Sequence, residues 1–364
     1  MKVLMISLDK GLLGNGQLGD VVERHQKYGQ YVDQLDIVVF SPTGFTNYKI
    51  SDKVNSYPTN SLSKLKYYFD AIKIGKELFN KTKYDLIITQ EPFVTGLVGV
   101  KLKKLFNTKL LVHFHGDFWD NPNWLKENKF NWLFLKMSKK VVPQADAIRV
   151  MSQGQKEKFS KLKNKLVKVI STPVDLEKYQ NVSSKKNPNN KMVLHVGRYD
   201  KVKDFQTLLK AFEIVDSKLS NIDFRQIGAD LHKIMDIPAN LNFISQPNKS
   251  SKVLVEKWYP MSDVVVLSST SESFGKVLVE ANAAGKPVVS TATTGAKEII
   301  QDGVNGYLAP IGDAQALADK ILYLLNNPDK AKEMGENGRK LVKEKYGDNT
   351  NKIINFWQEI VNEK

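Results

Sequence analysis

The stretch SDVVVLSSTSESFGKVLVEANAAGKPVVST, residues 262–291, decides the class of fold. Its apolar runs at 264–267 and 287–291 have the length and the β-branched composition of buried strands. Between them lies a segment with helical spacing of apolar residues, which we expect to begin near Gly275. A strand, a helix and a second strand in this order predict a parallel βαβ unit, with its ligand site at the carboxyl ends of the strands.

The same alternation continues along the chain. Further strands are predicted near residues 2–8, 35–40, 85–89, 109–113, 146–150, 166–170, 192–196, 222–227 and 241–244, and helices near 313–326, 328–345 and 351–361. A chain of 364 residues exceeds the size at which one core stops growing, and the polar stretch at 181–190 has linker composition. We therefore predict an α/β protein of two Rossmann-like, doubly wound lobes, residues 1–185 and 186–345, followed by a C-terminal helix in 346–364.

Composition excludes several kinds of protein and site. The chain has no cysteine, which excludes disulfides and thiolate metal sites. The apolar run at its start is too short for a signal peptide, and no stretch reaches the roughly 18 apolar residues of a membrane span. We therefore expect a cytoplasmic protein.

The net charge of +15 lies almost entirely in one half of the chain. Residues 1–190 hold 31 Lys and Arg against 17 Asp and Glu, whereas the remaining residues hold 23 against 22. This asymmetry indicates an anionic partner such as a membrane surface or nucleic acid; a solvated lysine-rich face is an equally open alternative. The aromatic and lysine-rich stretch 118–140, expected to be a helix, suits either a bilayer interface or the core of the first lobe with a solvated face.

A glycine loop follows the first predicted strand. Gly14, Gly16 and Gly19 match the G-x-G-x-x-G pattern of nicotinamide dinucleotide sites. They begin several residues beyond the strand, however, and the strand at 35–40 lacks the ribose-binding acid that should follow it, so a dehydrogenase is disfavoured. Backbone N–H groups at Gly14 and Gly16 are expected to face a phosphate or an acceptor hydroxyl, unless the loop is a plain turn.

Two glutamates flank the expected start of the helix near Gly275. Ser273, Phe274 and Gly275 lead into that helix, whose free N–H groups suit a pyrophosphate. Glu272 and Glu280 could lie up to about 12 Å apart along a helix, beyond the roughly 5–9.5 Å of a glycosidase acid pair. They are better suited to hold two ends of one elongated ligand, although a single glutamate on a helix is usually a solvated surface residue.

Two cations follow the strand at 192–196. Arg198 offers a planar fork to phosphate oxygens and Lys203 a point charge. Together they could neutralise a departing diphosphate without a metal, and the chain contains no Asp-x-Asp pair to hold one. The alternative is that both are ordinary surface cations.

With these motifs in place, the chain resembles glycosyltransferase family 4, the retaining enzymes of the GT-B fold. The motifs that carry the resemblance are the two glutamates with seven residues between them and the segments 113–116, 196–203, 284–289 and 302–308. The chain departs from the family at Asp204, where a glycine is usual after the phosphate-binding lysine. It departs again at Thr293-Thr294-Gly295, which replaces a double glycine.

The resemblance implies a role for each matching residue. Arg198 and Lys203 are expected to bind the donor diphosphate, Glu272 the donor sugar and Glu280 the ribose. His115 is expected to contact the transferred sugar, whereas His113 precedes it inside the strand as a packed neighbour. The resemblance also implies that the last helix returns to the N-terminal lobe, which would bind the acceptor. Asp117 could orient an acceptor hydroxyl or cap a helix.

We therefore predict a retaining hexosyltransferase that needs no metal or other cofactor. Its donor is expected to be a nucleotide diphosphate sugar, and its acceptor a hydroxyl of a saccharide or lipid-linked saccharide in polysaccharide or glycolipid synthesis. The basic N-terminal lobe is expected to lie peripherally on an anionic membrane. Two alternatives stay open: a GT-B-like sugar-nucleotide epimerase, and a basic nucleic-acid-binding protein, which is disfavoured because no nucleic-acid-binding module is recognisable.

Overall fold

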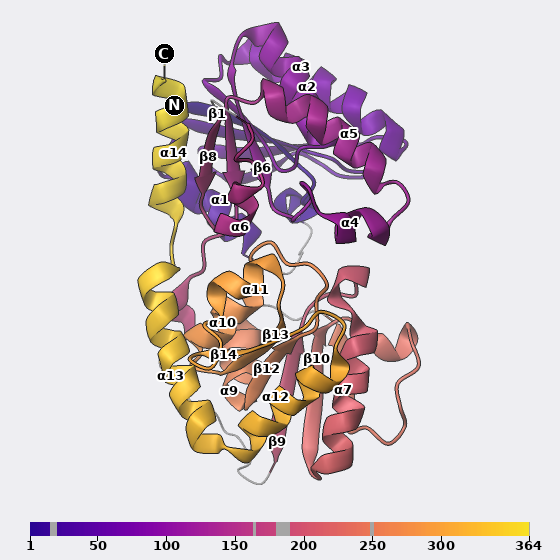
Figure 1. Cartoon of the computed structure of the whole chain (residues 1–364). Helices are drawn as coiled ribbons and strands as arrows, with labels where there is room; N and C mark the ends of the chain where they lie inside the picture. Colours follow the sequence, from indigo (N-terminus) through magenta and orange to yellow (C-terminus); the bar gives the residue numbers. More distant parts are fainter. Residues whose placement is uncertain (15–19, 163–164, 180–189, 248–250, 364) are drawn as a thin grey trace. The chain divides into compact units, whose positions relative to one another are not determined.

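The computed structural model describes residues 1–14, 20–162, 165–179, 190–247 and 251–363. Gly16 and most of the expected linker lie outside the described residues. The chain divides into two compact units. Unit 1 comprises Met1–Ser171 and Asn349–Lys364, and unit 2 comprises Thr172–Asp348. Each unit is a sheet between layers of helices (Figure 1).

The sheet of unit 1 has the strand order β3-β4-β2-β1-β5-β6-β7-β8. Its pairs are parallel except for β3 and β4, which form an antiparallel pair at one edge. The strands are β1 (Lys2–Ser7), β2 (Gln34–Val39), β3 (Tyr48–Ser51), β4 (Val54–Pro58), β5 (Leu86–Thr89), β6 (Lys109–Phe114), β7 (Ala147–Val150) and β8 (Leu166–Val169). The inner strands are apolar on both sides because helices cover both faces.

Strand β1 shows how the two faces are covered. Val3 and Met5 pack with α1 (Val21–Gly29) and α14 (Thr350–Asn362), whereas Leu4 and Ile6 point to the other face, as the period of two requires. That face carries α2 (Tyr67–Lys81), α3 (Val94–Phe106) and α5 (Asn131–Val141). The shorter elements of unit 1 are η1 (Lys10–Leu13), η2 (Lys64–Lys66), α4 (Pro122–Glu127), η3 (Val142–Gln144) and α6 (Gln153–Glu157).

The C-terminal helix α14 belongs to unit 1 although 177 residues of unit 2 precede it. It buries Phe356 and Trp357 against the same face as α1, and the Trp357 ring lies edge-on to Tyr28 with centroids 5.4 Å apart. Large buried aromatic rings contribute strongly to a core. The chain therefore begins and ends in one compact unit.

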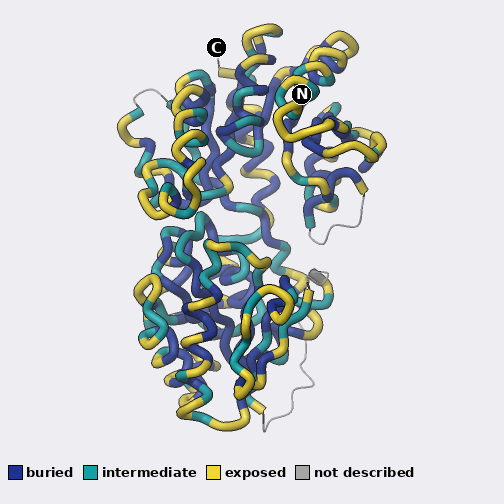
Figure 2. The backbone as a smooth tube through the Cα atoms, turned by 90° about the vertical axis from the view of Figure 1, so that its right-hand side faces the viewer, coloured by how far each residue is buried: buried dark blue, intermediate teal, exposed yellow. Residues whose placement is uncertain are grey.

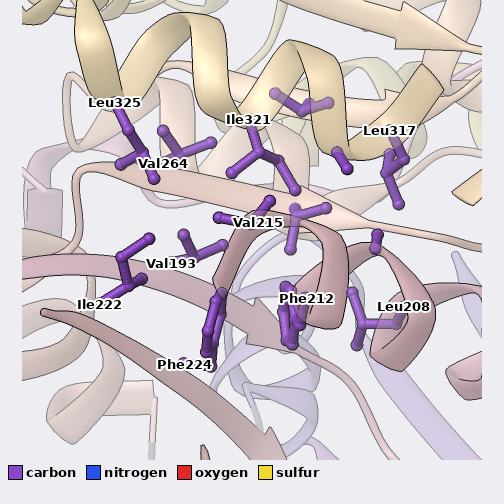
Figure 3. Packing of buried hydrophobic residues seen from close by; sticks show 14 of the residues in the cluster. Val193, Leu208, Phe212, Val215, Ile222, Phe224, Val264, Leu317, Ile321 and Leu325 are labelled. Atoms are coloured by element: carbon purple, nitrogen blue, oxygen red, sulfur yellow. The ribbon is translucent and has the colours of Figure 1, made fainter. Parts of the chain in front are cut away.

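The sheet of unit 2 is entirely parallel, in the order β11-β10-β9-β12-β13-β14. Its strands are β9 (Lys191–Val196), β10 (Ile222–Gly228), β11 (Phe243–Pro247), β12 (Val264–Leu267), β13 (Val288–Thr291) and β14 (Gly306–Ala309). One face is covered by α7 (Phe205–Lys218) and α12 (Ala314–Asn326), whose Phe212 and Ile321 meet Val193 and Val264 of the strands (Figure 3). This packing is the core of unit 2.

The remaining elements of unit 2 are η4 (Leu176–Tyr179), η5 (Lys201–Lys203), η6 (Leu231–Lys233), α8 (Ser251–Val253), the π-helix η7 (Leu254–Trp258), α9 (Tyr259–Met261), α10 (Lys276–Ala283), α11 (Thr294–Ile299) and α13 (Pro328–Lys345). In both units the buried residues follow the strands, and the exposed ones gather on helices and loops (Figure 2).

The structure confirms the predicted βαβ alternation and adds three strands that were not predicted. Strands β3 and β4 are rich in polar residues because they form an edge that is only half covered, and β14 is only four residues long. Strand β11 begins at Phe243 rather than at residue 241. The single helix expected in 118–140 is wrong: Asn128 is extended and its Oδ1 accepts from the Phe130 N–H, which separates α4 from α5.

Each sheet reverses its strand order once. In unit 1 the chain builds outward from β1 to β2 and β4 on one side, and from β5 to β8 on the other. In unit 2 the reversal lies between β9 and β12. Ligands of doubly wound sheets bind beyond the carboxyl ends of the strands at such a point. We therefore expect a ligand site at the residues that follow β9 and β12.

Candidate functional site

The residues that follow β9 and β12 come together in unit 2. The two strands are paired, with Val193 opposite Val264 and Leu194 opposite Val265. The loop after β9 continues into η5, and its Val202 C=O accepts a hydrogen bond from the Thr270 N–H of the loop after β12. Two motifs about 70 residues apart in sequence therefore form one surface at the switch point.

Lys203 and Glu272 form an ion pair at this surface. The Lys203 ammonium donates to Glu272 Oε1, and both side chains are largely buried. Ser269 Oγ donates to the same carboxylate oxygen at 2.8 Å, and Ser268 Oγ donates to the Lys203 C=O at 2.6 Å. The serines at the end of β12 thus hold both partners in place.

Arg198 is positioned differently from Lys203. Its side chain is 82% exposed and lies 3.7 Å from Asp200, a separation at which an exposed ion pair contributes little. The loop beneath it is rigidly held, because Gln226 Nε2 donates to the Gly197 C=O at 2.7 Å. Gly228 allows that loop to approach, since a Cβ at Gly228 would lie 2.2 Å from the Gly197 oxygen. Arg198 is therefore an accessible cation on a fixed loop.

Glu280 lies inside α10 and is 9% exposed. The Tyr259 hydroxyl donates to Glu280 Oε2 at 2.8 Å, and Lys276 Nζ lies 3.5 Å from Oε1, one helical turn away. Burial and the Glu280 charge raise the pKa of Tyr259 well above its ordinary value, so Tyr259 remains a hydrogen-bond donor. The carboxylate is held in one orientation with acceptor capacity left for a ligand.

Helix α10 begins as the sequence predicts. Gly275 takes φ = 81° at the N-cap, a conformation that favours glycine, and no side-chain cap is formed there among the described residues. Phe274 is buried, with its ring 5.5 Å from that of Tyr346, and Ser273 precedes it. A Cβ at Gly295 would lie 2.7 Å from the Phe274 backbone, so this glycine permits the close approach of α11. The helix start is thus well placed to bind an anion.

The two departures from the family pattern have local explanations. Asp204 takes φ = 44°, the left-handed conformation that explains why a glycine is usual at this position. Its carboxylate also caps α7, accepting from the Thr207 N–H at 3.2 Å and from the Thr207 hydroxyl at 2.6 Å. Thr293 caps α11 in the same way through Ala296, while the glycine that packing requires, Gly295, is kept. Neither departure disrupts the surface.

His195 lies beneath the cations and is fully buried. Its ring packs edge-on against Phe205 at 5.1 Å, and neither ring nitrogen has a hydrogen-bond partner among the described residues. Burial, with a smaller contribution from Lys203, lowers the pKa of His195 to about 3. His195 is therefore neutral at ordinary pH.

In unit 1, His115 follows the end of β6 and is exposed, whereas His113 inside the strand is buried, as expected. The two rings meet edge-on at 5.4 Å. Burial beside Arg149 lowers the pKa of His113 well below its ordinary value. The Arg149 guanidinium in turn donates to the C=O groups of Ile170 and Ser171, which ties it to the end of β8.

Asp117 is not the helix cap that the sequence allowed. Asn121 caps α4, accepting from the N–H groups of Asn123 and Trp124. The buried Asp117 instead forms an ion pair at 2.6 Å with Lys158, which is partly exposed. Gly14 closes η1 with φ = 78°, next to the Tyr48 ring, and Gly16 lies outside the described residues.

Sequence reasoning missed several residues that shape the surface in unit 2. They are Tyr259 and Lys276, which hold Glu280, Ser268 and Ser269, which hold the ion pair, and Gln226 and Gly228, which hold the loop before Arg198. Only the i,i+4 spacing of Lys276 and Glu280 is a signal visible in the sequence. The other contacts join segments distant along the chain.

Neither a metal-binding cluster nor a membrane-spanning helix is found among the described residues. No group of three or more His, Asp or Glu side chains among these residues is arranged to hold a metal ion. None of the helices in the described part of the chain has both the length and the apolar character needed to cross a membrane.

Comparison with known proteins identifies the family of the chain. The family model described as Glycosyltransferase Family 4 matches residues 31–178, and the one described as Glycosyl transferases group 1 matches residues 177–341. An uncharacterised glycosyltransferase of Methanocaldococcus jannaschii is 30% identical over 284 residues, which are 77% of this chain and 76% of the relative.

Two solved structures share the whole architecture. A sucrose-phosphate synthase of Thermosynechococcus elongatus superposes with a TM-score of 0.77 at 19% identity, covering 99% of this chain and 96% of its own. The Anabaena protein HepE, in complex with UDP-glucose, superposes with a TM-score of 0.74 at 20% identity, covering 99% of both chains. At such identities the likeness establishes the fold.

Proposed function

Since the chain belongs to glycosyltransferase family 4 and has the GT-B fold, we propose that it transfers a hexosyl unit with retention of configuration. It is a glycosyltransferase by its family. The proposed donor is a nucleotide diphosphate sugar bound by unit 2. The proposed acceptor is a hydroxyl of a saccharide or lipid-linked saccharide bound by unit 1.

The observation that carries the proposal is the direct contact of Lys203 with Glu272. A cation suits a phosphate and a carboxylate suits sugar hydroxyls, so a ligand that meets both must carry these groups side by side. In a nucleotide diphosphate sugar the sugar is bonded to the terminal phosphate. The pair therefore supports a donor in which the bond that breaks lies between these two residues.

The other groups match the rest of such a donor. The uncapped start of α10 and the accessible Arg198 suit the diphosphate. Glu280, held by Tyr259 and buried within α10, suits the two hydroxyls of the ribose. The arrangement requires no metal, because two cations and a helix start can offset the charge of the leaving diphosphate.

In the proposed reaction, the bond from the anomeric carbon to the diphosphate oxygen breaks as the acceptor oxygen attacks from the same face. The acceptor proton passes to the departing diphosphate oxygen. Retention by this route needs no enzyme nucleophile. The same-face route is consistent with the contacts of Glu272. Its carboxylate accepts hydrogen bonds from Lys203 and Ser269, and these bonds make the carboxylate a weaker nucleophile. His115, exposed at the end of β6, is the proposed contact of unit 1 with the transferred sugar.

A thermal-shift screen against UDP-, GDP- and ADP-sugars tests the donor assignment, because a ligand that binds the folded state raises its apparent stability. UDP-glucose is the first candidate, since HepE was solved with it. One nucleotide series should raise the melting temperature of the parent and not that of Glu280→Gln. If no series does so, or if Glu280→Gln responds like the parent, the donor site is wrongly assigned.

Product analysis separates transfer from the epimerase alternative. With the donor found by the screen and a hydroxyl acceptor, the sugar should appear on the acceptor with its anomeric configuration unchanged. A chelator should leave the rate unchanged. An inverted product, a chelator-sensitive rate, or an epimerised sugar formed without acceptor would each contradict the part of the proposal that it addresses.

A further inference from the structure

The most exposed large apolar side chains of the described residues lie together in unit 1. Leu62, Leu65 and Phe69 are 79%, 87% and 68% exposed. They follow β4 and belong to the segment that contains η2 and the first turn of α2. Soluble proteins rarely expose a cluster of large apolar side chains to water unless the cluster is an interaction site.

Leu65 and Phe69 share one face of the helical segment, and Leu62 lies just before the segment. Leu65 and Phe69 are four residues apart. The exposed Lys66, Lys73 and Lys76 continue the same face at helical spacing, together with one exposed acid, Glu77. The opposite face of α2 is buried against the sheet through Ala71, Leu78 and Phe79. The outward face, hereafter the Leu62–Phe69 face, is thus apolar at its start and net basic along its length, with three lysines against one glutamate.

The position of this face relates it to the acceptor side of unit 1. Because the segment follows the carboxyl end of β4, the apolar residues lie at the carboxyl ends of the parallel strands, where His115 follows β6. On the same face of the sheet, α5 begins near the exposed Phe130 and Trp132. There Lys136 Nζ lies 4.5 Å from the centre of the Trp132 ring.

We propose that the Leu62–Phe69 face docks unit 1 onto an anionic lipid bilayer. The leucine and phenylalanine side chains enter the boundary between headgroups and acyl chains, and the lysines bind lipid phosphates. Docking itself does not depend on the proposed function. Only the kind of acceptor does, because a membrane-bound transferase would act on a saccharide displayed on that membrane.

Charge and side-chain chemistry favour a bilayer over other occupants. In a symmetric pair of chains joined through this face, both copies would present the same net positive charge, because the lysines outnumber Glu77, and the two faces would repel. A nucleic acid would match the lysines, but leucine side chains neither stack on bases nor donate hydrogen bonds. An anionic bilayer is complementary to both the apolar and the basic part.

Vesicle sedimentation tests the proposal with the full chain. The parent should bind vesicles of phosphatidylglycerol mixed with phosphatidylcholine, and bind vesicles of phosphatidylcholine alone much more weakly. Leu65→Ser/Phe69→Ser should lower the partition coefficient by about tenfold or more, because buried apolar area drives insertion. The matched control is Leu105→Ser. Leu105 is an exposed leucine near the end of α3, where the amino end of β6 begins, and so lies away from the carboxyl ends of the strands.

A charge variant, Lys66→Glu/Lys73→Glu, should remove the preference for anionic vesicles, whereas Lys332→Glu/Lys343→Glu on α13 of unit 2 should not. Equal binding to both kinds of vesicle by the parent would overturn the proposal. So would equal binding by the parent and Leu65→Ser/Phe69→Ser, or self-association through this face in the absence of lipid.

A fluorescent label shows whether the face enters the membrane. The chain has no cysteine, so Leu65→Cys creates a single labelling site. An environment-sensitive dye at this site should shift its emission to the blue on adding anionic vesicles, and the same dye at Leu105→Cys should not. An unshifted spectrum at Leu65→Cys would refute insertion. The donor thermal shift should be the same in every variant, so that failure of membrane docking and failure of the proposed function are distinguished.

Discussion

Lys203 donates a hydrogen bond to Glu272 although 69 residues separate them in the chain. Strand β9 delivers the lysine and β12 the glutamate, and the pairing of these strands brings the two side chains together. In the absence of a ligand each neutralises the other. A bound donor is expected to replace this contact with phosphate on the lysine and sugar hydroxyls on the glutamate.

Replacing this lysine tests its role in transfer. Lys203→Met should lower kcat by about a hundredfold, because a cation placed at the leaving diphosphate stabilises charge that develops in the transition state. Donor affinity should change much less. Lys201→Met is the control, since Lys201 is an exposed lysine on the same turn. Steady-state kinetics measures both effects, and a Lys203→Met enzyme with unchanged kcat would exclude this role.

The hydroxyl that holds Glu280 should matter for donor affinity. Tyr259→Phe removes the hydrogen bond to Glu280 Oε2 and should raise the Kd of the nucleoside diphosphate by about tenfold, since hydrogen bonds to charged groups are worth roughly 1.5–3 kcal/mol. Titration calorimetry gives the Kd. Tyr323→Phe, at an exposed tyrosine, should leave it unchanged. Equal affinity of Tyr259→Phe and the parent would show that this contact is not needed for binding.

The close approach of α11 to Phe274 should tolerate no side chain. In Gly295→Ala the new Cβ would meet the Phe274 backbone at 2.7 Å, which should displace the start of α10, lower stability by about 1–3 kcal/mol and weaken nucleotide binding. Gly303→Ala is the control: its Cβ meets no atom within 4 Å, although φ = 79° carries backbone strain. Denaturant titration and nucleotide binding distinguish the two, and normal binding by Gly295→Ala would contradict the argument.

Acidification should destabilise unit 2 through His195. Its pKa is lowered from 6.5 to about 3 in the folded state, so below pH 6.5 the unfolded chain takes up a proton that the folded chain does not. Stability is therefore unaffected above pH 6.5 and falls as the pH drops from 6.5 toward 3. The loss between pH 7 and pH 5 should be about 2 kcal/mol.

His195→Phe fills the same site without a titrating group. Its free energy of unfolding, measured by urea titration at both pH values, should fall about 2 kcal/mol less than that of the parent. His232→Phe, at an exposed histidine of unit 2, is the control. Identical pH dependence of the parent and His195→Phe would mean that His195 is not buried as a neutral ring.

His115 should act in transfer and not in donor binding. His115→Ala is expected to lower transfer by about a hundredfold or more, within the range for removing one positioned polar group from a reacting centre. The nucleotide-induced thermal shift should persist, because the groups proposed to hold the nucleotide lie in unit 2. His232→Ala serves as the control. If His115→Ala transfers sugar at the parent's rate, the assignment of unit 1 to the transferred sugar fails.

Most of the fold could be predicted from the sequence because it rests on local patterns. Most parallel strands of the two sheets are recognisable as short apolar runs, since burial on both faces demands apolar residues throughout; the parallel strands β4 and β14 were not predicted. The start of α10 at Gly275 was equally readable, because a positive φ favours glycine. The β3–β4 edge was missed, because a half-covered antiparallel pair has no continuous apolar run.

The site was predicted as a set of residues but not as a set of contacts. Arg198, Lys203, Glu272 and Glu280 were predicted as site residues, and in the structure Lys203 contacts Glu272 and Glu280 contacts Tyr259. A bilayer interface was one of two interpretations of residues 118–140, whereas the most exposed large apolar side chains of the described residues are Leu62, Leu65 and Phe69. Exposure depends on what packs over a residue, which hydropathy along the chain does not record.

By itself the sequence determined the two βαβ lobes, the charge asymmetry and the residue types available for chemistry, because periodicity, propensity and charge are properties of neighbours along the chain. Only the tertiary structure decided which of those residues meet. Strand order places β9 beside β12, and that choice is made by the packing of whole helices and strands rather than by any short segment. The contact between Lys203 and Glu272 is its direct consequence.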